Sequence, residues 1–247
     1  MEDFESIPDH FHHKFKIDAE REILLTIPSG VFVPTGTTSV LIEAVRTYVC
    51  KPGKVLDLAC GSGIVGIALH KIGIVVSPFY ASDLSKRAID CTKENAALYH
   101  CPVVAKCGPF FEPWENEKFD YIVDDISGIS EEVAKISPWY NNVSCQSGCD
   151  GTSLVVKIVQ EAPIHLNPGG LFFFPVISFS NVDKILSAAR ANFAHVERLI
   201  HREWPLLKEM YQHLPTLKRL KEMGHVQYAE KFGMVIWSTD VYVAYNS

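Results

Sequence analysis

The chain has 247 residues, of which 47% are hydrophobic, and 23 lysines and arginines against 29 aspartates and glutamates give a formal net charge of −6. This length and apolar content suffice for one α/β domain with a full core, and they exclude two large domains. The negative charge gives no overall attraction to a phosphate-rich partner, and the sequence shows no secretion signal or long apolar span, so we predict a cytoplasmic protein without membrane contact.

Cysteine and histidine do not form a metal-binding pattern. The seven cysteines are scattered, which in a cytoplasmic protein predicts free thiols. Cys145 and Cys149 are four residues apart without a second pair, and the histidines at 10, 12 and 13 have no helical or cysteine partner. No metal site is therefore predicted.

Residues 1–50 are predicted as an N-terminal arm and a segment that covers the cofactor site. The polar stretch up to about Ala19 is expected to lie on the surface or to remain loose. Ile23–Ile27 is predicted as a short strand, and Val40–Tyr48 as a helix capped by Thr37 or Thr38. Residues 51–247 then form the core of the protein.

The core begins with the most informative stretch, a buried strand at Val55–Ala59 that ends in Gly61-Ser62-Gly63. Glycine tolerates backbone angles and close approaches that a Cβ forbids, so a ligand can lie against bare backbone at this turn. The helix that follows from Gly63 to His70 presents its N-terminus there, which favours a carboxylate or a phosphate.

Two acids help to separate the cofactors that use such a turn. A second predicted strand ends at Asp83, about 20 residues past the glycines, where a carboxylate grips a ribose diol. Asp57, before the turn, suits a cationic amino-acid end and would repel a pyrophosphate. The third glycine of the dinucleotide pattern is missing, so the residues favour S-adenosylmethionine over a dinucleotide.

Strands and helices alternate through the rest of the core. This alternation predicts a doubly wound, mostly parallel, seven-stranded α/β sheet with ligands at the carboxyl ends of its strands. A helical, aromatic insertion at 204–224 interrupts the pattern before the last strand, and we interpret it as a substrate lid or as a packing or dimerisation helix. After the first strand and helix, the predicted elements are Phe79–Ser82, Ser85–Tyr99, Val103–Lys106, Tyr121–Asp124, Gly151–His165, Leu171–Ile177, Asn181–Phe193, His195–His201 and Met234–Ala244.

The stretch Leu56–Gly63, together with Asp83, resembles the cofactor site of class I methyltransferases. Further segments resemble the HemK/PrmC-type branch, which methylates protein glutamine and whose relatives also modify bases in nucleic acids. These segments are Gly30–Pro34, Phe119–Val123, Gly148–Gly151 and Asn167–Gly170. The resemblance implies a Rossmann-like fold and S-adenosyl-L-methionine as the cofactor. The cofactor-binding residues that follow are Asp57, Ala59, Cys60, Gly61, Ser62, Gly63, Asp83, Leu84, Phe110 and Asp124.

The chain departs from this family pattern at two places. Where the relatives carry Asn-Pro-Pro-Tyr, this chain has Asp125-Ile126-Ser127-Gly128, so the grip on a planar amide is lost. Pro109 stands where the relatives have an acid that bonds the adenine amino group, which leaves adenine to backbone atoms, Leu84 or Phe110.

Asp124 and Asp125 end a buried strand, where unpaired charge is unfavourable, so we interpret them as substrate-holding or catalytic groups. Asp125 is the first choice for a general base and Asp124 the second; the alternative is a cap of the following segment. The residues expected to line the acceptor pocket are Ser127, Trp139, Tyr140, Asn141, Trp204 and Tyr211.

The leading hypothesis is an S-adenosylmethionine-dependent methyltransferase that acts on an amine or hydroxyl of a small molecule. Protein-glutamine or RNA methylation is the first alternative, with a protein or RNA as the acceptor. An aminopropyl-type transferase is the second, although the second acid of its spaced pair falls on Gly128. A non-catalytic S-adenosylmethionine-binding protein is the third. The oligomeric state stays open, with a homodimer compatible with the insertion.

Overall fold

The computed structural model describes residues 10–246 except 127 and 142. Its centre is an eight-stranded sheet with the strand order β5-β4-β3-β6-β7-β10-β8, and β9 pairs with β10 beside this path. The strands are β3 (Val55–Leu58), β4 (Phe79–Asp83), β5 (Val103–Cys107), β6 (Phe119–Asp124), β7 (Leu166–Ile177), β8 (His195–Pro205), β9 (Ala229–Lys231) and β10 (Met234–Tyr245).

Strands β3 to β7 pair in parallel, whereas β10 runs antiparallel to both β7 and β8. The predicted doubly wound, mostly parallel sheet is therefore confirmed, and the short β9 adds an eighth strand to the seven expected.

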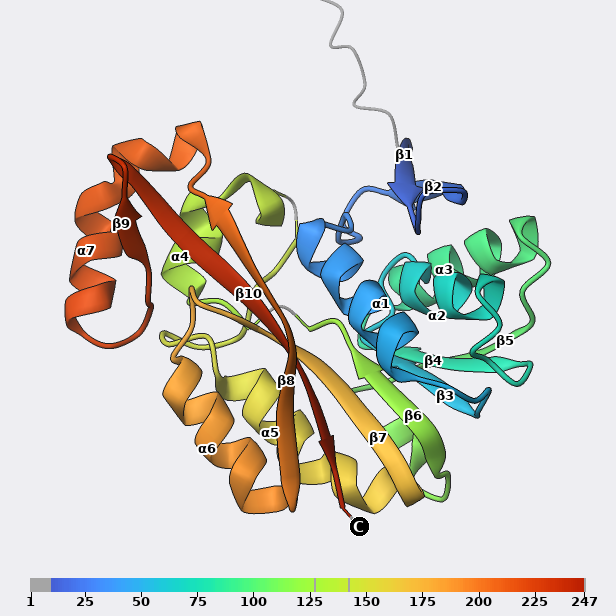
Figure 1. The fold of residues 1–247 in the computed structure, drawn as a ribbon. Coiled ribbons are helices and arrows are strands. Elements are labelled where there is room, and N and C mark those ends of the chain that lie inside the picture. Colours follow the sequence, from blue (N-terminus) through green and yellow to red (C-terminus); the bar gives the residue numbers. More distant parts are fainter. Residues whose placement is uncertain (1–9, 127, 142, 247) are drawn as a thin grey trace, which may run out of the picture.

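Helices cover both faces of the sheet (Figure 1). Side chains alternate along the strands, so that Val123 and Phe173 face α1 to α3 while Ile122 and Phe172 face α5 and α6. This alternation divides the core into two apolar layers. The helices are α1 (Gly36–Tyr48), α2 (Ile64–Lys71), α3 (Lys86–Leu98), α4 (Glu131–Ile136), α5 (Ser153–Glu161), α6 (Val182–Asn192) and α7 (Leu214–Glu222).

The expected N-terminal arm contains an ordered hairpin, β1 (His10–Lys16) paired with β2 (Glu22–Pro28). It packs on α3, where the Asn95 side chain donates to the Thr26 carbonyl oxygen and accepts from its N–H. Helix α1 begins earlier than predicted, because Thr35 is extended and its hydroxyl accepts the Thr37 N–H. The predicted cap at Thr37 or Thr38 is therefore wrong.

The helix predicted at Gly151–His165 ends earlier, and residues 167–170 lie within β7. Helix α5 ends at Glu161, and a 3₁₀ turn at Ala162–His165 separates it from the strand. The Asn167 amide donates to Asp120 Oδ1 at 2.8 Å, which ties the start of β7 to β6. The helix-breaking residues at 167–170 thus lie at the start of a strand, where the pairing with β6 contains a bulge.

A third apolar cluster joins the predicted insertion to a segment that the sequence analysis left unassigned. Residues 129–140, which include α4, and residues 206–237, which include α7 and β9, pack together; we call them the cap (Figure 1). Strand β8 extends to Pro205, so Trp204 belongs to the sheet and not to the insertion. In the described part of the chain, no helix is long and apolar enough to cross a membrane.

Candidate cofactor and acceptor site

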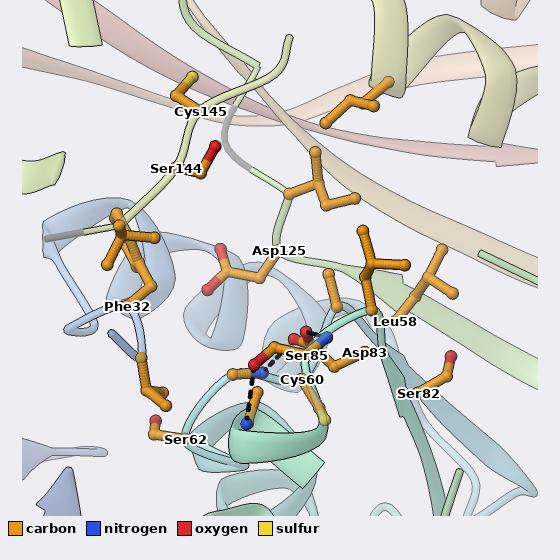
Figure 2. A pocket seen from close by; sticks show the side chains of 18 of the residues that line it. Phe32, Leu58, Cys60, Ser62, Ser82, Asp83, Ser85, Asp125, Ser144 and Cys145 are labelled. Carbon is orange, nitrogen blue, oxygen red and sulfur yellow. Dashed lines mark hydrogen bonds between the residues drawn. The ribbon is translucent and has the colours of Figure 1, made fainter. Parts of the chain in front are cut away.

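A cavity of about 500 Å³ lies where β3, β4 and β6 end, which is the ligand side predicted for such a sheet. Its opposite walls come from the segment before α1, at 30–34, and from the loop at 143–147. Figure 2 shows Asp125 pointing into the middle of this space, with Phe32 on one side and Leu58 on the other.

The glycine turn forms one wall of the cavity with bare backbone. Gly61 and Gly63 have φ angles of 52° and 80°, and a Cβ on Gly63 would meet Thr92 at 3.0 Å. Ala59 shares this left-handed conformation, with φ at 58°, although it carries a Cβ. Ala59, Cys60, Gly61 and Ser62 line the cavity as predicted, whereas Gly63 caps helix α2 behind them.

Asp83 lies at the end of β4 and presents its carboxylate to the cavity. Its Oδ2 accepts the Gly61 N–H at 3.0 Å and its Oδ1 accepts the Ser85 N–H at 2.8 Å. These bonds fix the carboxylate beside the glycine turn, where its remaining lone pairs can accept bonds from a ligand's hydroxyls. Burial raises the pKa of this carboxyl above its ordinary value.

Next to Asp83, apolar side chains form another wall of the cavity. Leu84 is 70% exposed and lines the cavity together with Pro109 and Phe110. The Ser82 hydroxyl donates to the Phe110 carbonyl oxygen at 3.2 Å, which holds this loop against the end of β4. The structure thus brings Leu84 and Phe110 together in the cavity that Asp83 lines, and their contact with adenine stays a prediction.

Asp125, at the end of β6, is the candidate general base. Its Oδ2 accepts the Thr38 hydroxyl from α1 at 2.7 Å. Burial raises the pKa of the Asp125 carboxyl to about 7, against the opposing effect of this hydrogen bond. A group that titrates near neutrality can accept a proton from a substrate at physiological pH.

Asp57 and Asp124, by contrast, lie beneath the cavity and do not line it, although the sequence analysis assigned both to the cofactor and Asp124 also to catalysis. Asp57 Oδ2 accepts the Gly66 N–H and Asp124 Oδ1 accepts the Ile126 N–H, both at 2.9 Å. Their other oxygens have no partner among the described residues. Both side chains are buried because each acid lies one residue before the part of the chain that lines the cavity.

Burial also raises the pKa of both these carboxyls, that of Asp57 to about 8. Coulomb repulsion from Asp125 also raises the pKa of both carboxyls. Repulsion from Asp83 raises the pKa of Asp57, and repulsion from Asp57 raises that of Asp124. The four acids therefore form an acidic floor, and a cationic ligand above it would lower their pKa values and favour their charged forms.

The residues predicted for the acceptor separate into two groups. Trp139, Tyr140 and Trp204 line a second cavity of about 270 Å³, which adjoins the first at Tyr140 and Phe32. Asn141 is exposed and lines neither cavity. Tyr211 packs inside the cap, where its hydroxyl oxygen accepts the Val235 N–H at 3.4 Å, and Ser127 lies outside the described residues.

Among the residues of the site that the sequence analysis did not assign to it are Phe32, Thr38 and Trp237. Phe32 had a signal, since its segment was expected over the cofactor. Trp237 lies within the last strand, and its sequence context gave no signal. Among the described residues, no cluster of three or more His, Cys, Asp or Glu can hold a metal, and all seven cysteines are free.

The sheet order with one antiparallel strand, the glycine turn and the acid after the next strand define the class I methyltransferase fold. A family model described as ribosomal protein L11 methyltransferase (PrmA) matches residues 8–149, and the chain belongs to this family. The resemblance to the HemK/PrmC-type branch is not confirmed by this match.

Individual relatives agree with the fold. The ribosomal protein L11 methyltransferase of Staphylococcus aureus is 33% identical over 145 residues, which cover 57% of this chain and 45% of that protein. The chain thus matches less than half the length of this curated relative. A ribosomal protein L11 methylase from Lactobacillus delbrueckii subsp. bulgaricus superposes with a TM-score of 0.54 at 19% identity, covering 85% of this chain and 79% of its own.

A 16S rRNA methyltransferase from T. thermophilus, solved with AdoMet and guanosine, has a TM-score of 0.62 at 16% identity and covers 96% of this chain and 51% of its own. At such identities the likeness of these solved structures establishes the fold alone.

Proposed function

We propose that this protein transfers a methyl group from S-adenosylmethionine to an amine nitrogen. The observation that carries this proposal is the pairing, in one cavity, of the Asp83 carboxylate fixed to the Gly61 N–H with the Asp125 carboxylate fixed to Thr38. The first fits a ribose diol and the second fits the nucleophile. S-adenosylmethionine, when bound, supplies an electrophilic methyl group on a sulfonium.

The cavity also fits the charge of this cofactor. Its α-ammonium group and its sulfonium both carry positive charge, and the floor of the cavity holds the carboxyls of Asp57 and Asp124, each with one oxygen without a partner among the described residues. Unpaired buried carboxylates are unfavourable unless a cation compensates them. The apolar wall of Leu84 and Phe110 supports a flat purine beside Asp83.

The work left to the protein is alignment and proton removal, because transfer from a sulfonium is already favourable. A carboxylate cannot both donate to and accept from a planar amide, whereas it can accept a hydrogen bond from an ammonium and take its proton. With a pKa near 7, Asp125 serves this purpose at neutral pH. This supports an amine over a glutamine side chain or a nucleobase.

Two acceptor classes follow. The name of the matched family supports an amine of a ribosomal protein as the first candidate. The second candidate is the amine of a small molecule, and the apolar second cavity, which adjoins the cavity that Asp125 lines, supports it. Incubation with radiolabelled S-adenosylmethionine, in parallel with isolated ribosomal proteins and with a panel of small amines, separates the two candidates.

Cofactor binding is tested by titration calorimetry on Asp83→Ala. Loss of charge-assisted bonds to the ribose typically costs about 1.5–3 kcal/mol, so binding should weaken about tenfold to a hundredfold. Asp90→Ala is the matched control, because Asp90 pairs with Lys86 on the exposed side of α3. Equal affinity in Asp83→Ala and the control, with both folded, would refute the ribose assignment.

A further inference from the structure

We infer that the second cavity is a subsite for a flat, apolar ring of the acceptor, so that the acceptor is an amine attached to an aromatic group. This rests on the proposed function, because it places the nucleophile of that reaction at Asp125. The subsite lies between the start of α1 and the cap, and three of the chain's four tryptophans line it: Trp139, Trp204 and Trp237.

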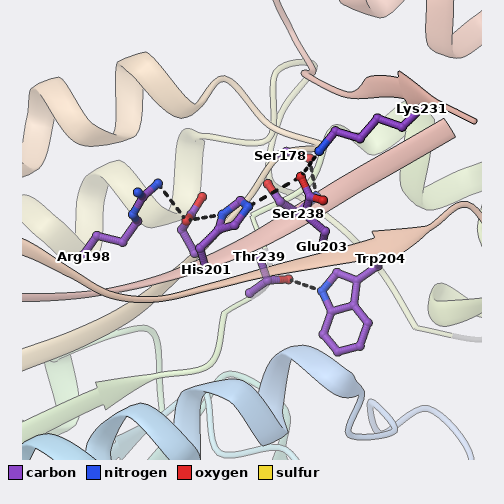
Figure 3. Close-up of polar contacts among 9 residues, drawn as sticks. Ser178, Arg198, His201, Glu203, Trp204, Lys231, Ser238 and Thr239 are labelled. Atoms are coloured by element: carbon purple, nitrogen blue, oxygen red, sulfur yellow. Dashed lines mark hydrogen bonds and ion pairs between the residues drawn. The ribbon is translucent and has the colours of Figure 1, made fainter.

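Two of these indoles are held with their polar atoms turned to the protein. Trp204 Nε1 donates to the Thr239 hydroxyl at 3.2 Å, as Figure 3 shows, and Trp237 Nε1 donates to the Pro205 carbonyl oxygen at 3.3 Å. Trp139 packs on Trp237 with ring centroids 5.1 Å apart. The cavity therefore presents ring surfaces, and not these two N–H groups, to a ligand. Such a lining suits a ligand with a ring that stacks.

The polar side chains of the lining are also engaged. The Thr37 and Thr239 hydroxyls are hydrogen-bonded to each other at 3.1 Å, and the Thr35 hydroxyl accepts the Thr37 N–H. No charged side chain lines this cavity in the described part of the chain. A nucleobase would leave its polar edge unpaired here, whereas a hydrocarbon ring loses nothing on entry.

The size of the cavity agrees with a ring. A protein cavity of about 150 Å³ is large enough to bind benzene. The second cavity has a volume of about 270 Å³, which exceeds that needed for one benzene ring and leaves room for a short linker or a fused ring. A straight aliphatic chain, such as a lysine stem, would leave part of this volume empty and its walls without contacts.

The two cavities are arranged so that one molecule can reach both. Phe32 and Tyr140 line each of them, with their rings 5.2 Å apart. On α1, Thr37 lines the second cavity, while the next residue, Thr38, holds Asp125 in the first. One molecule can therefore place an amine at Asp125 and a ring in the aromatic subsite.

The test uses the intrinsic fluorescence of the subsite tryptophans, with phenethylamine as the aromatic probe and butylamine as its aliphatic counterpart. Both are titrated with and without saturating S-adenosylhomocysteine. We expect phenethylamine to give a saturable change and to bind about tenfold tighter than butylamine, since burial of a phenyl ring contributes strongly to affinity. The Trp139→Leu and Trp204→Leu variants should each reduce this preference.

The control is Trp114→Phe, because Trp114 is buried in the core layer of α5 and α6, outside both cavities. It should retain the preference, and circular dichroism checks the fold of each variant. Equal binding of the two amines, or an unchanged preference in folded Trp139→Leu and Trp204→Leu, would overturn the subsite. Discrimination between the amines without any binding of S-adenosylhomocysteine would support the subsite and instead refute the proposed methyl transfer.

Discussion

The substitution Asp125→Asn tests the proposed general base with the least disturbance of shape. Asparagine has nearly the same volume, and its amide oxygen can still accept the Thr38 hydroxyl that Asp125 Oδ2 accepts at 2.7 Å. What it loses is the capacity to take a proton. General bases contribute about a hundredfold or more to the rate, so kcat should fall by about that factor. Binding of S-adenosylmethionine should remain nearly unchanged.

The pH dependence gives a second, independent magnitude. Asp125 acts as the carboxylate, and its pKa of about 7 lies well above the ordinary value of 3.8. The carboxylate fraction in the free enzyme is then about one tenth at pH 6 and about nine tenths at pH 8, so kcat/KM should rise about tenfold between them. In the ternary complex the nearby sulfonium favours the carboxylate, so the profile of kcat should shift to lower pH.

The assay is initial-rate transfer of a radiolabelled methyl group to the accepted substrate across this pH range. Thr38→Val serves as the matched variant: it removes a bond to the charged form and should move the profile to higher pH, with a similar plateau. Full activity in Asp125→Asn, or a parental profile with no rise between about pH 6 and pH 8, would refute the role of this carboxyl.

Two further predictions concern the buried acids and the cap. The raised carboxyl pKa values, about 8 for Asp57 and about 7 for Asp125, mean that the folded state binds more protons than the unfolded state above the ordinary value of 3.8. The Tm of the ligand-free protein should therefore fall as pH rises from about 4 to about 8, and a Tm that rises over this window in thermal scans would contradict the burial of these acids. The segment 206–223 of the cap should exchange its amide hydrogens faster than β8 and β10 and gain protection when cofactor and acceptor bind, whereas equal protection throughout would identify it as a packing element only.

The sheet could be predicted because its signals are local. An apolar run such as Val55–Leu58 followed by Gly61-Ser62-Gly63 is compatible with few local structures other than a buried strand and a tight turn. The alternation of strands with helices then restricts the topology of the sheet. The elements that were missed depend on distant partners. Helix α4 is only six residues long and is stabilised by its contacts with the cap. Strand β1 was missed, and it pairs with β2, which was predicted at Ile23–Ile27; this hairpin contacts α3 through Asn95, about 70 positions away in sequence.

The site was predicted in part for a similar reason. The end of a strand locates an acid to within about a residue, and that precision places Asp83 and Asp125 in the cavity. An uncertainty of one residue, however, exchanges Asp124 for Asp125. Because neighbouring residues of a strand point to opposite sides, the sequence alone did not show which of the two side chains enters the cavity. Tyr211 was expected in the acceptor pocket because the insertion was interpreted as a substrate lid, and its side chain instead packs in the cap. Trp237 enters the second cavity by its pairing with Trp204, a cross-strand contact that no short-range pattern encodes.

The order of these parts along the chain has a consequence for how such a protein diversifies. The glycine turn, Asp83 and Asp125 all lie in the half that the family model matches, whereas Trp204 and Trp237 lie beyond it. Because β8 and β10 carry these tryptophans to the edge of the cavity on a ladder shared with the sheet, residues 204–237 form a cassette with fixed ends. Exchange of this cassette among relatives would change which molecule is recognised while leaving the methyl donor's contacts intact, and a single fold could in this way acquire new substrates by recombination.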